Sequence, residues 1–350
     1  MKNFLFFLFL SIGVLGIAQS NFTKNFNEGA NLLQVDKYNE AAKKFSTALS
    51  YKMEESNRYR IVDAYLYRGL CKYNLNNFEG AIDDFNEAMG LKPEYVKTYQ
   101  FKTFVYNAQK KYEKSIESID IGLKYRPDDL ELLQTKSTIL FLQKKYDDSN
   151  VILKSVLETN PKEISAIKGI GNNFMYKKLW DSAAVYYNMA IEINPLDIGS
   201  YYNLGIVKSH MLDYSNAKID IEKAMRLDTV STYVGYNNLG FFLKLEQKQY
   251  AEAIEYFDKA IAMNPKFSYA YSNRSYAKLM IGDIKGAYKD VKKSIEIDNT
   301  NSYAFKNLAK ICLKDGKNKD ACVNLKKAID LGYADSYDDE VDILLKENCK

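Results

Sequence analysis

The sequence has little of what most catalytic and metal sites require. Its 350 residues include one histidine, His210, and four cysteines. The HExxH, CxxC and GxSxG motifs and the glycine-rich phosphate loop, each of which supports a specific chemistry, do not occur. We therefore expect no enzymatic activity, no cofactor and no metal site. Acidic pairs such as Asp83 with Asp84 and Asp128 with Asp129 are interpreted as solvated charges or as residues that stabilise a helix start.

A strong charge of one sign is missing as well. The 49 basic and 45 acidic residues are interleaved, and the formal net charge is +4. Proteins that bind nucleic acid normally concentrate lysine and arginine on one face, where they contact phosphates. The sequence therefore gives no indication of nucleic-acid binding.

Long apolar runs are missing except at the N-terminus. The segment MKNFLFFLFLSIGVLGIAQS has one lysine, an apolar run from Phe4 to Ile17, and small residues at Ala18 and Ser20. This layout is typical of a cleavable secretory signal, and the run is shorter than the roughly 20 residues that span a bilayer. We predict a signal peptide at 1–20, cleaved after Ala18 or Ser20, and an exported protein without stable membrane insertion. The alternative is a retained membrane anchor.

Proline is scarce, and its spacing is regular. Pro93, Pro127, Pro161 and Pro195 follow one another at intervals of 34, and Pro265 comes 70 residues later, close to twice that interval. Each proline precedes two segments with helical apolar periodicity, and proline ends a helix because it lacks the N–H that the helix needs. The spacing predicts repeated helical hairpins joined at the prolines.

Small residues recur with the same period. Three of the sets are Gly69, Ala81 and Ala88; Gly171, Ala183 and Ala190; and Gly205, Ala217 and Ala224. Larger apolar residues share one position in the second helix of the units, namely Phe45, Phe85, Leu153, Tyr187, Ile221, Phe257, Val291 and Leu325. We expect the helices to approach one another too closely at the small positions for a longer side chain to fit.

This arrangement resembles the tetratricopeptide repeat, a helix–turn–helix unit of 34 residues with small residues at its eighth, twentieth and twenty-seventh positions. The resemblance implies an all-α, right-handed α-solenoid whose first helices line a concave face. About nine repeats are expected at 21–335, beginning near Phe22, Val62, Val96, Leu130, Ile164, Ile198, Tyr233, Ser268 and Ser302. Residues 336–350, with Val341, Leu344 and Leu345 on one side, are predicted to form a C-terminal capping helix.

The repeats depart from the pattern in three places. The first repeat is about six residues longer, around Ser50 to Ile61, and the seventh has one extra residue, which we place in its hairpin turn at Leu245 to Tyr250. In repeats three and four the small positions hold Thr103, Ser115, Ser137 and Ser149. We expect looser packing in these two repeats but no domain boundary.

The four cysteines fall into two classes. Cys71 and Cys312 lie on predicted first helices, where a small buried thiol is expected. Cys322 begins the last second helix, and Cys349 ends the capping helix that should fold back against it. Export permits disulfides, so we predict a Cys322–Cys349 bond. Four reduced thiols are the alternative.

The resemblance implies that the second, fifth, ninth, twelfth and thirteenth residues of each repeat point into the concave groove. We predict a partner-binding groove in the later repeats, with the candidate residues Lys168, Asn172, Tyr176, Tyr202, Asn203, Asn237, Phe241, Tyr269, Tyr276 and Lys306. Tyrosine offers a large rigid surface with a hydroxyl group, and asparagine can bond a peptide backbone.

Some tetratricopeptide domains clamp the C-terminal carboxylates of chaperone partners. Lys168, Asn172 and Asn203 match two layers of such a clamp. The third layer fails, because Val234 and Asn238 stand where the clamp needs two cations, and charge-assisted hydrogen bonds are the strong part of a carboxylate site.

The function that the resemblance implies is that of a non-catalytic scaffold or adaptor for protein–protein interaction. It would bind a partner protein or an extended peptide on its concave face, in the periplasm or outside the cell, as part of a bacterial envelope. The alternative is a module that recognises a small molecule or a polysaccharide, which the scarcity of acidic residues beside the aromatic ones disfavours. Partner identity and oligomeric state stay open at this point.

Overall fold

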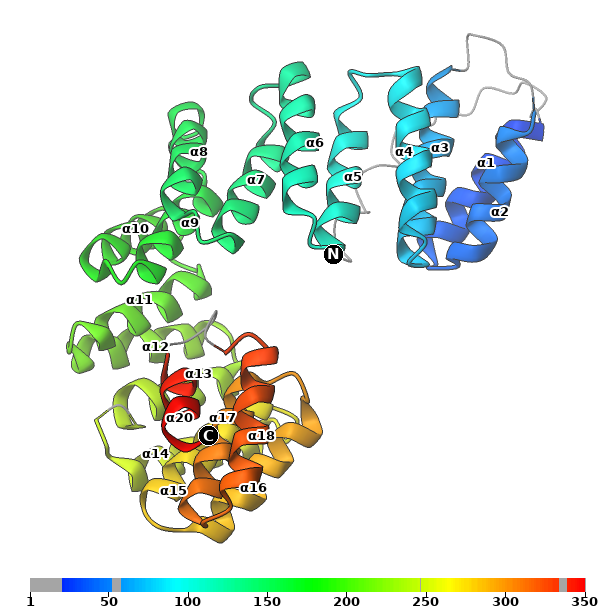
Figure 1. The fold of residues 1–350 in the computed structure, drawn as a ribbon. Helices are drawn as coiled ribbons and strands as arrows, with labels where there is room; N and C mark the ends of the chain where they lie inside the picture. Colours follow the sequence, from blue (N-terminus) through cyan, green and yellow to red (C-terminus); the bar gives the residue numbers. More distant parts are fainter. Residues whose placement is uncertain (1–20, 52–57, 246, 334–338, 350) are drawn as a thin grey trace. The chain divides into compact units, whose positions relative to one another are not determined.

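The computed structural model describes residues 21–51, 58–245, 247–333 and 339–349, and within these ranges all regular secondary structure is helical (Figure 1). The predicted signal peptide at 1–20 lies outside them, as does most of the insertion between Ser50 and Ile61. The helices follow one another as hairpins of a first and a second helix. The prediction of an all-α array of helix–turn–helix repeats is therefore confirmed.

Residues up to Pro161 form one compact unit, and residues from Lys162 onward form another. The first unit contains repeats one to four: α1 (Asn21–Gln34) with α2 (Tyr38–Leu49), α3 (Arg58–Asn74) with α4 (Phe78–Leu91), α5 (Val96–Ala108) with α6 (Tyr112–Tyr125), and α7 (Leu130–Leu142) with α8 (Tyr146–Thr159). The boundary follows the two repeats that have hydroxyl side chains at the small positions, where we had expected looser packing without a boundary.

The second unit contains repeats five to nine. They are α9 (Ile164–Tyr176) with α10 (Trp180–Ile193), α11 (Ile198–His210) with α12 (Tyr214–Leu227), α13 (Thr232–Asn238) and η3 (Leu239–Leu245) with α14 (Tyr250–Met263), α15 (Ser268–Met280) with α16 (Ile284–Ile297), and α17 (Ser302–Lys314) with α18 (Asn318–Asp330). The helix α20 (Glu340–Asn348) packs against α18 and buries Val341.

The ends of the hairpins lie close to where the sequence places them. The helices that begin at predicted repeat starts are α5, α7, α9, α11, α15 and α17, whereas α1 and α13 begin one residue earlier and α3 begins four residues earlier. Each of the five prolines lies in the turn that follows a second helix. Asp129 caps α7 by accepting a hydrogen bond from the Leu132 N–H at 3.1 Å, which is one of the helix-start roles expected of the acidic pairs.

The turn inside each hairpin has one geometry throughout. Its second residue has a positive φ, between 55° and 63° where it is not glycine, as in Leu212 and Lys248, and 89° and 72° at Gly282 and Gly316. The next residue donates its N–H to a carbonyl five residues back, as Asp213 does to Lys208 at 2.9 Å. This is the Schellman closure of a helix C-terminus, which satisfies a carbonyl that the helix itself leaves unpaired.

The extra residue of the seventh repeat is not in the hairpin turn, so that prediction is wrong. The turn there has the common geometry, with the Gln249 N–H donating to the Lys244 carbonyl at 2.7 Å. Instead, the second half of the first helix is the π-helix η3. A π-helix closes i→i+5 hydrogen bonds and takes up one residue. The packing of Gly240, in the first turn of η3, and the hairpin turn after η3 are thereby both preserved.

Ring packing explains the small positions. The shared apolar residues of the second helices are almost fully buried, as at Phe85 and Phe257. A Cβ atom added at Gly69 would lie 2.5 Å from Phe85 Cε1, and one added at Gly240 would lie 2.8 Å from Phe257 Cε1. At Gly69 and Gly240 the first helix can therefore approach the ring of its partner this closely only because it has no side chain there.

Asp84 is not solvated as we expected, and this prediction is wrong. It lies on the side of α4 that faces α3, is almost fully buried, and pairs with Arg68 Nη2 at 2.6 Å and Lys72 Nζ at 2.9 Å. Two cations with hydrogen-bonding geometry compensate the desolvation of one carboxylate. The adjacent Asp83 is exposed, in agreement with the sequence interpretation.

Candidate partner-binding face of residues 162–350

The ten side chains predicted to line a groove all belong to first helices of the second unit. They are Lys168, Asn172 and Tyr176 on α9, Tyr202 and Asn203 on α11, Asn237 on α13, Phe241 on η3, Tyr269 and Tyr276 on α15, and Lys306 on α17. First helices of nearby repeats lie against one another, α11 against η3 and α15 against α17. They thus form the inner side of this stack, and we call their accessible surface the first-helix face.

These ten side chains differ in how accessible they are. Tyr176 and Tyr269 are 53% and 43% exposed. Lys168, Asn172, Tyr202, Asn203, Phe241 and Tyr276 are half-buried. Asn237 and Lys306 are buried, so they could contact a partner only after a rearrangement. The face that is accessible in this structure therefore centres on the two exposed tyrosines and the half-buried residues.

The three residues that match a carboxylate clamp are already bonded within the chain. Lys168 Nζ pairs with Asp197 Oδ1 at 2.9 Å. Asn203 Nδ2 donates to Asn172 Oδ1 at 3.2 Å, and the Tyr187 hydroxyl donates to the same oxygen at 2.7 Å. Burial opposes the ionisation of Asp197, but the hydrogen bonds it accepts and the charge of Lys168 outweigh this effect and lower its pKa. The charge of Lys168 is thus neutralised by the chain itself.

Asparagine recurs at the sixth position of four successive repeats, as Asn203, Asn238, Asn273 and Asn307. Asn273 Nδ2 donates to Asn237 Oδ1 at 2.9 Å, and Asn307 Nδ2 donates to the Ser272 carbonyl at 3.0 Å. These bonds reach back to the first helix of the preceding repeat. The sequence predicted partner binding by Asn203 and Asn237, which stays a prediction. The regular spacing was the signal that these amides also connect neighbouring repeats.

Aromatic rings form a continuous path along the second unit. Trp180 stacks on His210 with ring centroids 4.3 Å apart, and His210 meets the edge of Phe242 at 5.7 Å. Phe241 lies against both Phe242 and Tyr303, at 4.9 and 6.5 Å. Trp180 also packs against the core of repeats five and six. Partial burial and the nearby Lys178 both lower the pKa of His210.

Lys306 lies among three tyrosine rings, an arrangement that the sequence did not reveal. Its ammonium group is 4.1 Å from the Tyr303 ring centroid, 5.3 Å from that of Tyr276 and 5.7 Å from that of Tyr333. Glu340, on α20, pairs with Lys306 through Oε2 at 3.0 Å and with Lys310 through Oε1 at 2.5 Å. Burial alone would raise the pKa of Glu340, but the two lysines outweigh it and hold the pKa below its ordinary value.

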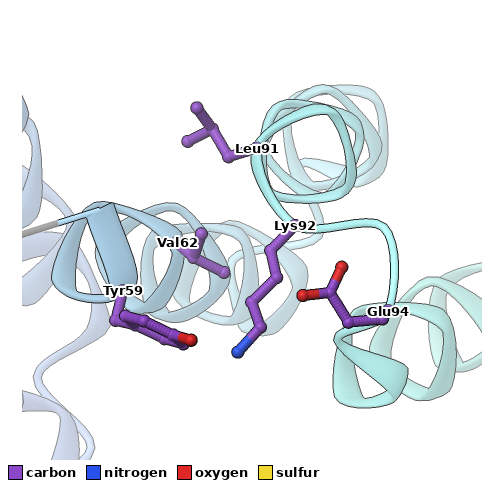
Figure 2. Close-up of a pocket in the computed structure, with 5 residues that line it drawn as sticks. All are labelled: Tyr59, Val62, Leu91, Lys92 and Glu94. Carbon is purple, nitrogen blue, oxygen red and sulfur yellow. The ribbon is translucent and has the colours of Figure 1, made fainter. Parts of the chain in front are cut away.

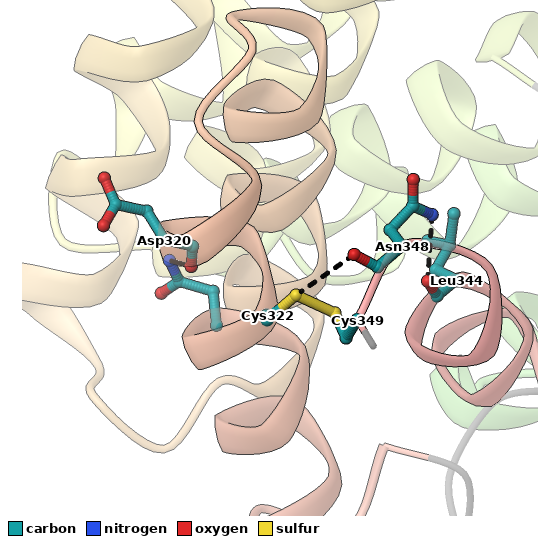
Figure 3. The surroundings of a disulfide bond; sticks show 6 residues. Asp320, Cys322, Leu344, Asn348 and Cys349 are labelled. Carbon is teal, nitrogen blue, oxygen red and sulfur yellow. Dashed lines mark hydrogen bonds between the residues drawn. A yellow bond between two sulfur atoms is a disulfide. The ribbon is translucent and has the colours of Figure 1, made fainter.

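A disulfide joins Cys322, on α18, to Cys349, at the end of α20, with the two Cα atoms 5.7 Å apart (Figure 3). The carbonyl oxygen of Asn348 lies beside the bond, 3.6 Å from Cys322 Sγ. Cys71 and Cys312 are free and buried. Burial raises the pKa of both thiols, that of Cys71 to about 12, so neither is a reactive thiolate near neutral pH.

The first unit has a cavity of about 210 Å³ lined by Tyr59, Val62, Leu91, Lys92 and Glu94 (Figure 2). The Lys92 ammonium lies 3.9 Å from the Tyr59 ring centroid, a distance at which a cation and an aromatic face attract each other. The cavity is open, and it is smaller than the roughly 300–1,000 Å³ that is usual for small-molecule sites.

Within the described part of the chain, no helix is long and apolar enough to cross a bilayer. The same residues include no group of three or more histidine, cysteine, aspartate or glutamate side chains placed to hold a metal ion.

The segments of this chain that match a known protein family correspond to its repeats. Models of the tetratricopeptide repeat match residues 26–95, 198–230 and 234–267. The chain contains tetratricopeptide repeats. A tetratricopeptide repeat protein from Parabacteroides merdae ATCC 43184 has a similar structure, with a TM-score of 0.60 at 20% identity over 73% of this chain and 99% of that one. At this identity the similarity concerns the fold.

Curated relatives match over shorter segments. The chain is 40% identical over 53 residues to the Hsp70-Hsp90 organizing protein of Triticum aestivum, which is 15% of this chain and 9% of that protein. It is 38% identical over 47 residues to the tetratricopeptide repeat protein 36 of Danio rerio, which is 13% of this chain and 25% of that protein. The chain thus spans a quarter or less of the length of these two relatives.

Proposed function

We propose that this protein is an exported, non-catalytic binding protein whose first-helix face at residues 162–350 holds an extended segment of a partner protein. Tetratricopeptide repeats generally mediate protein–protein contacts, and stacked repeats offer long surfaces for this purpose. The observation that carries the proposal is the row of exposed and half-buried tyrosine, phenylalanine and asparagine side chains on successive first helices. Rigid aromatic rings bury large areas at low entropic cost.

The electrostatics of the face support a partner held mainly by aromatic and amide contacts. Both lysines among the candidate residues are paired with carboxylates of the chain, Lys168 with Asp197 and Lys306 with Glu340. A partner carboxylate would have to displace these acids, at the cost of breaking partly buried ion pairs. The accessible part of the face therefore favours apolar and hydrogen-bonding segments.

Two features support export to an oxidising compartment. The sequence of residues 1–20 has the layout of a secretory signal. The Cys322–Cys349 disulfide is a bond of the kind that persists outside the reducing cytosol. N-terminal sequencing of the mature protein tests this part: a start at Gln19 or Asn21 is expected, and an intact Met1 in the membrane fraction would contradict it.

The binding face is tested with a photo-reactive amino acid placed at Tyr269 and, in a second variant, at Tyr176. The matched control is Tyr288, on the second helix α16, which is 44% exposed and thus as accessible as Tyr269. After irradiation of producing cells, we expect the two first-helix variants to form a discrete covalent product and the control to form none. Products at Tyr288 alone, or equally at all three positions, would contradict the assignment.

A further inference from the structure

The C-terminal helix α20 places a carboxylate where the ninth repeat holds two cations. Glu340 bridges Lys306 and Lys310, one carboxylate oxygen to each lysine. Lys306 is 3% exposed, and its ammonium group lies within 6 Å of three tyrosine rings. A cation buried to this extent needs an anion beside it. Lys306 on α17 therefore requires an acidic partner, and in this structure Glu340 is such a partner.

Three kinds of interaction hold α20 in place. Val341 is fully buried, and Leu344 and Leu345 pack against the same core. Glu340 supplies the ion pairs, and the disulfide ties Cys349 to α18. A helix of nine residues is not stable in water by itself, so α20 stays folded only while it is docked. The disulfide limits how far it can separate from α18, because it closes a loop of 27 residues.

We propose that α20 is an internal ligand of the ninth repeat, secured by the Cys322–Cys349 bond. When a dithiol reductant opens this bond, α20 can leave, and an acidic side chain of a partner segment takes the place of Glu340 between Lys306 and Lys310. In the redox step the protein disulfide gains two electrons and two protons and becomes two thiols, and the dithiol becomes a disulfide. The proposal rests on the proposed binding function and adds to it a redox control of one end of the face.

The sequence of α20 indicates the chemistry of the partner. Its docked side presents a glutamate followed directly by a buried valine, with Leu344 and Leu345 one turn later. A segment with an acidic residue beside apolar residues would make the same contacts. The reduced chain offers this site in competition with its own α20, so the apparent affinity is lowered by the fraction of molecules in which α20 is docked.

Hydrogen exchange on the full-length mature protein tests the release of α20. The amides of α20 should exchange about 100-fold faster after treatment with a dithiol, because the opened state is no longer restricted by the loop. Cys71 and Cys312 are free, so the reductant has this one bond to break. The double variant Cys322→Ser with Cys349→Ser should behave as the reduced protein does without any reductant. Unchanged exchange in both would overturn the proposal.

The binding step is tested with a dye-labelled peptide that has the sequence of residues 339–348. By fluorescence anisotropy we expect about 10-fold tighter binding to the reduced protein than to the oxidised one, and a further gain with Glu340→Gln, which weakens the internal competitor. A peptide with glutamine at the position that corresponds to Glu340, and with its second glutamate unchanged, should bind the same protein about 10-fold more weakly. Equal affinity for the oxidised and reduced protein, or for both peptides, would refute the proposal.

The experiments distinguish a failure of the redox-control proposal from a failure of the proposed partner-binding function. If photo-crosslinking at Tyr176 and Tyr269 persists while the peptide binds neither redox form, the binding face stands and the redox control is wrong. If the peptide binds as expected but the tyrosine variants give no product, the ninth-repeat site stands and the wider face is wrong.

Discussion

Repeats three and four of the first unit and repeats five and six of the second unit use the same hairpin but fill its small positions differently. In repeats five and six of the second unit these positions are glycine or alanine, for example Gly205 and Ala217. In repeats three and four of the first unit they include Thr103 and Ser137, both buried. The Thr103 hydroxyl donates to the Tyr99 carbonyl of its own helix at 2.8 Å. A buried polar group that is satisfied within its own helix costs little, so the fold tolerates it.

One feature recurs in both units with a small difference. In repeat eight, Asp290 pairs with Arg274 at 2.7 Å and Lys278 at 2.8 Å, as Asp84 does with its two cations in repeat two. Arg274 also has a second partner, Asp258, at 2.6 Å. The three-residue arrangement of the second unit thus has an additional acid, Asp258, whereas in the first unit Arg68 Nη1 donates to the Ser46 hydroxyl at 3.2 Å.

The largest effect should come from removing these buried carboxylates. Asp84→Ala leaves two partly buried cations without their anion and should cost about 3 kcal/mol. Asp290→Ala should lower the free energy of unfolding by less than Asp84→Ala does, because Arg274 still pairs with Asp258. Hydrogen exchange of the α3–α4 and α15–α16 amides measures each hairpin separately. Asp83→Ala, at the exposed neighbouring position, is the control and should stay within about 0.5 kcal/mol of wild type. Equal losses in the free energy of unfolding for Asp84→Ala and Asp290→Ala would contradict the expected difference between the two hairpins.

The next effect tests the small positions. A Cβ at Gly205 would lie 2.6 Å from Ile221 Cγ1 and 3.0 Å from the Ala217 carbonyl oxygen. Overpacking of this kind costs about 1 to 3 kcal/mol, so we expect Gly205→Ala to destabilise the protein in urea unfolding. Ser137→Ala, at the equivalent position of repeat four, adds no atom and should change the free energy of unfolding by less than about 1 kcal/mol. A neutral Gly205→Ala would show that the second unit is no more tightly packed there.

A smaller effect should appear in the hairpin turns. Leu212 is 72% exposed and has a φ of 63°, a conformation that is unfavourable for a residue with a large side chain. Leu212→Gly should therefore stabilise the second unit by about 0.5–1 kcal/mol, seen as a higher thermal midpoint. Asn76→Gly, at the same turn position of the first unit, should gain less, because asparagine tolerates this conformation. A lower midpoint for Leu212→Gly would mean that its side chain makes a contact worth more than the strain.

The smallest effect concerns the pair formed by the single tryptophan and the single histidine. As the pH falls, His210 takes up a proton beside Trp180, and the tryptophan emission should change with a midpoint below the ordinary value near 6.5. The pKa of His210 is lowered in the folded protein, so the unfolded chain binds the proton first. Stability is therefore complete above about pH 6.5 and decreases as the pH falls from there towards the folded pKa. His210→Gln should give a flat emission profile, and a midpoint above 6.5 would contradict the lowering of the His210 pKa by burial and Lys178.

Much of the fold could be predicted because it follows from local rules. Proline joints, small positions and apolar periodicity act within one repeat, and six first helices begin at the residue that the sequence indicates. The π-helix was missed because one extra residue can be taken up in a turn or in a helix, and only the packing of Gly240 against Phe257 selects between them. The prediction that Asp84 is solvated was wrong because its ion-pair partners, Arg68 and Lys72, lie on the preceding helix α3.

The candidate face was harder to predict than the fold. Nothing in the local sequence around Lys168 shows that Asp197, 29 residues later, neutralises it. Lys306 and Glu340 are 34 residues apart, which is the length of one repeat. The repeat period could therefore have been used to predict this ion pair. Tyr176 and Tyr269 stay the accessible members of the predicted groove.

The sequence by itself determined the period, the hairpins and the residues that pack between their helices, because these depend on helix-breaking prolines and on side-chain size at fixed spacings. Only the tertiary structure decided which polar side chains are already used within the chain. Their partners come from neighbouring repeats, as with Asn273 and Asn237, 36 residues apart, and a hydrogen bond or an ion pair forms only where the stacking brings the two groups together.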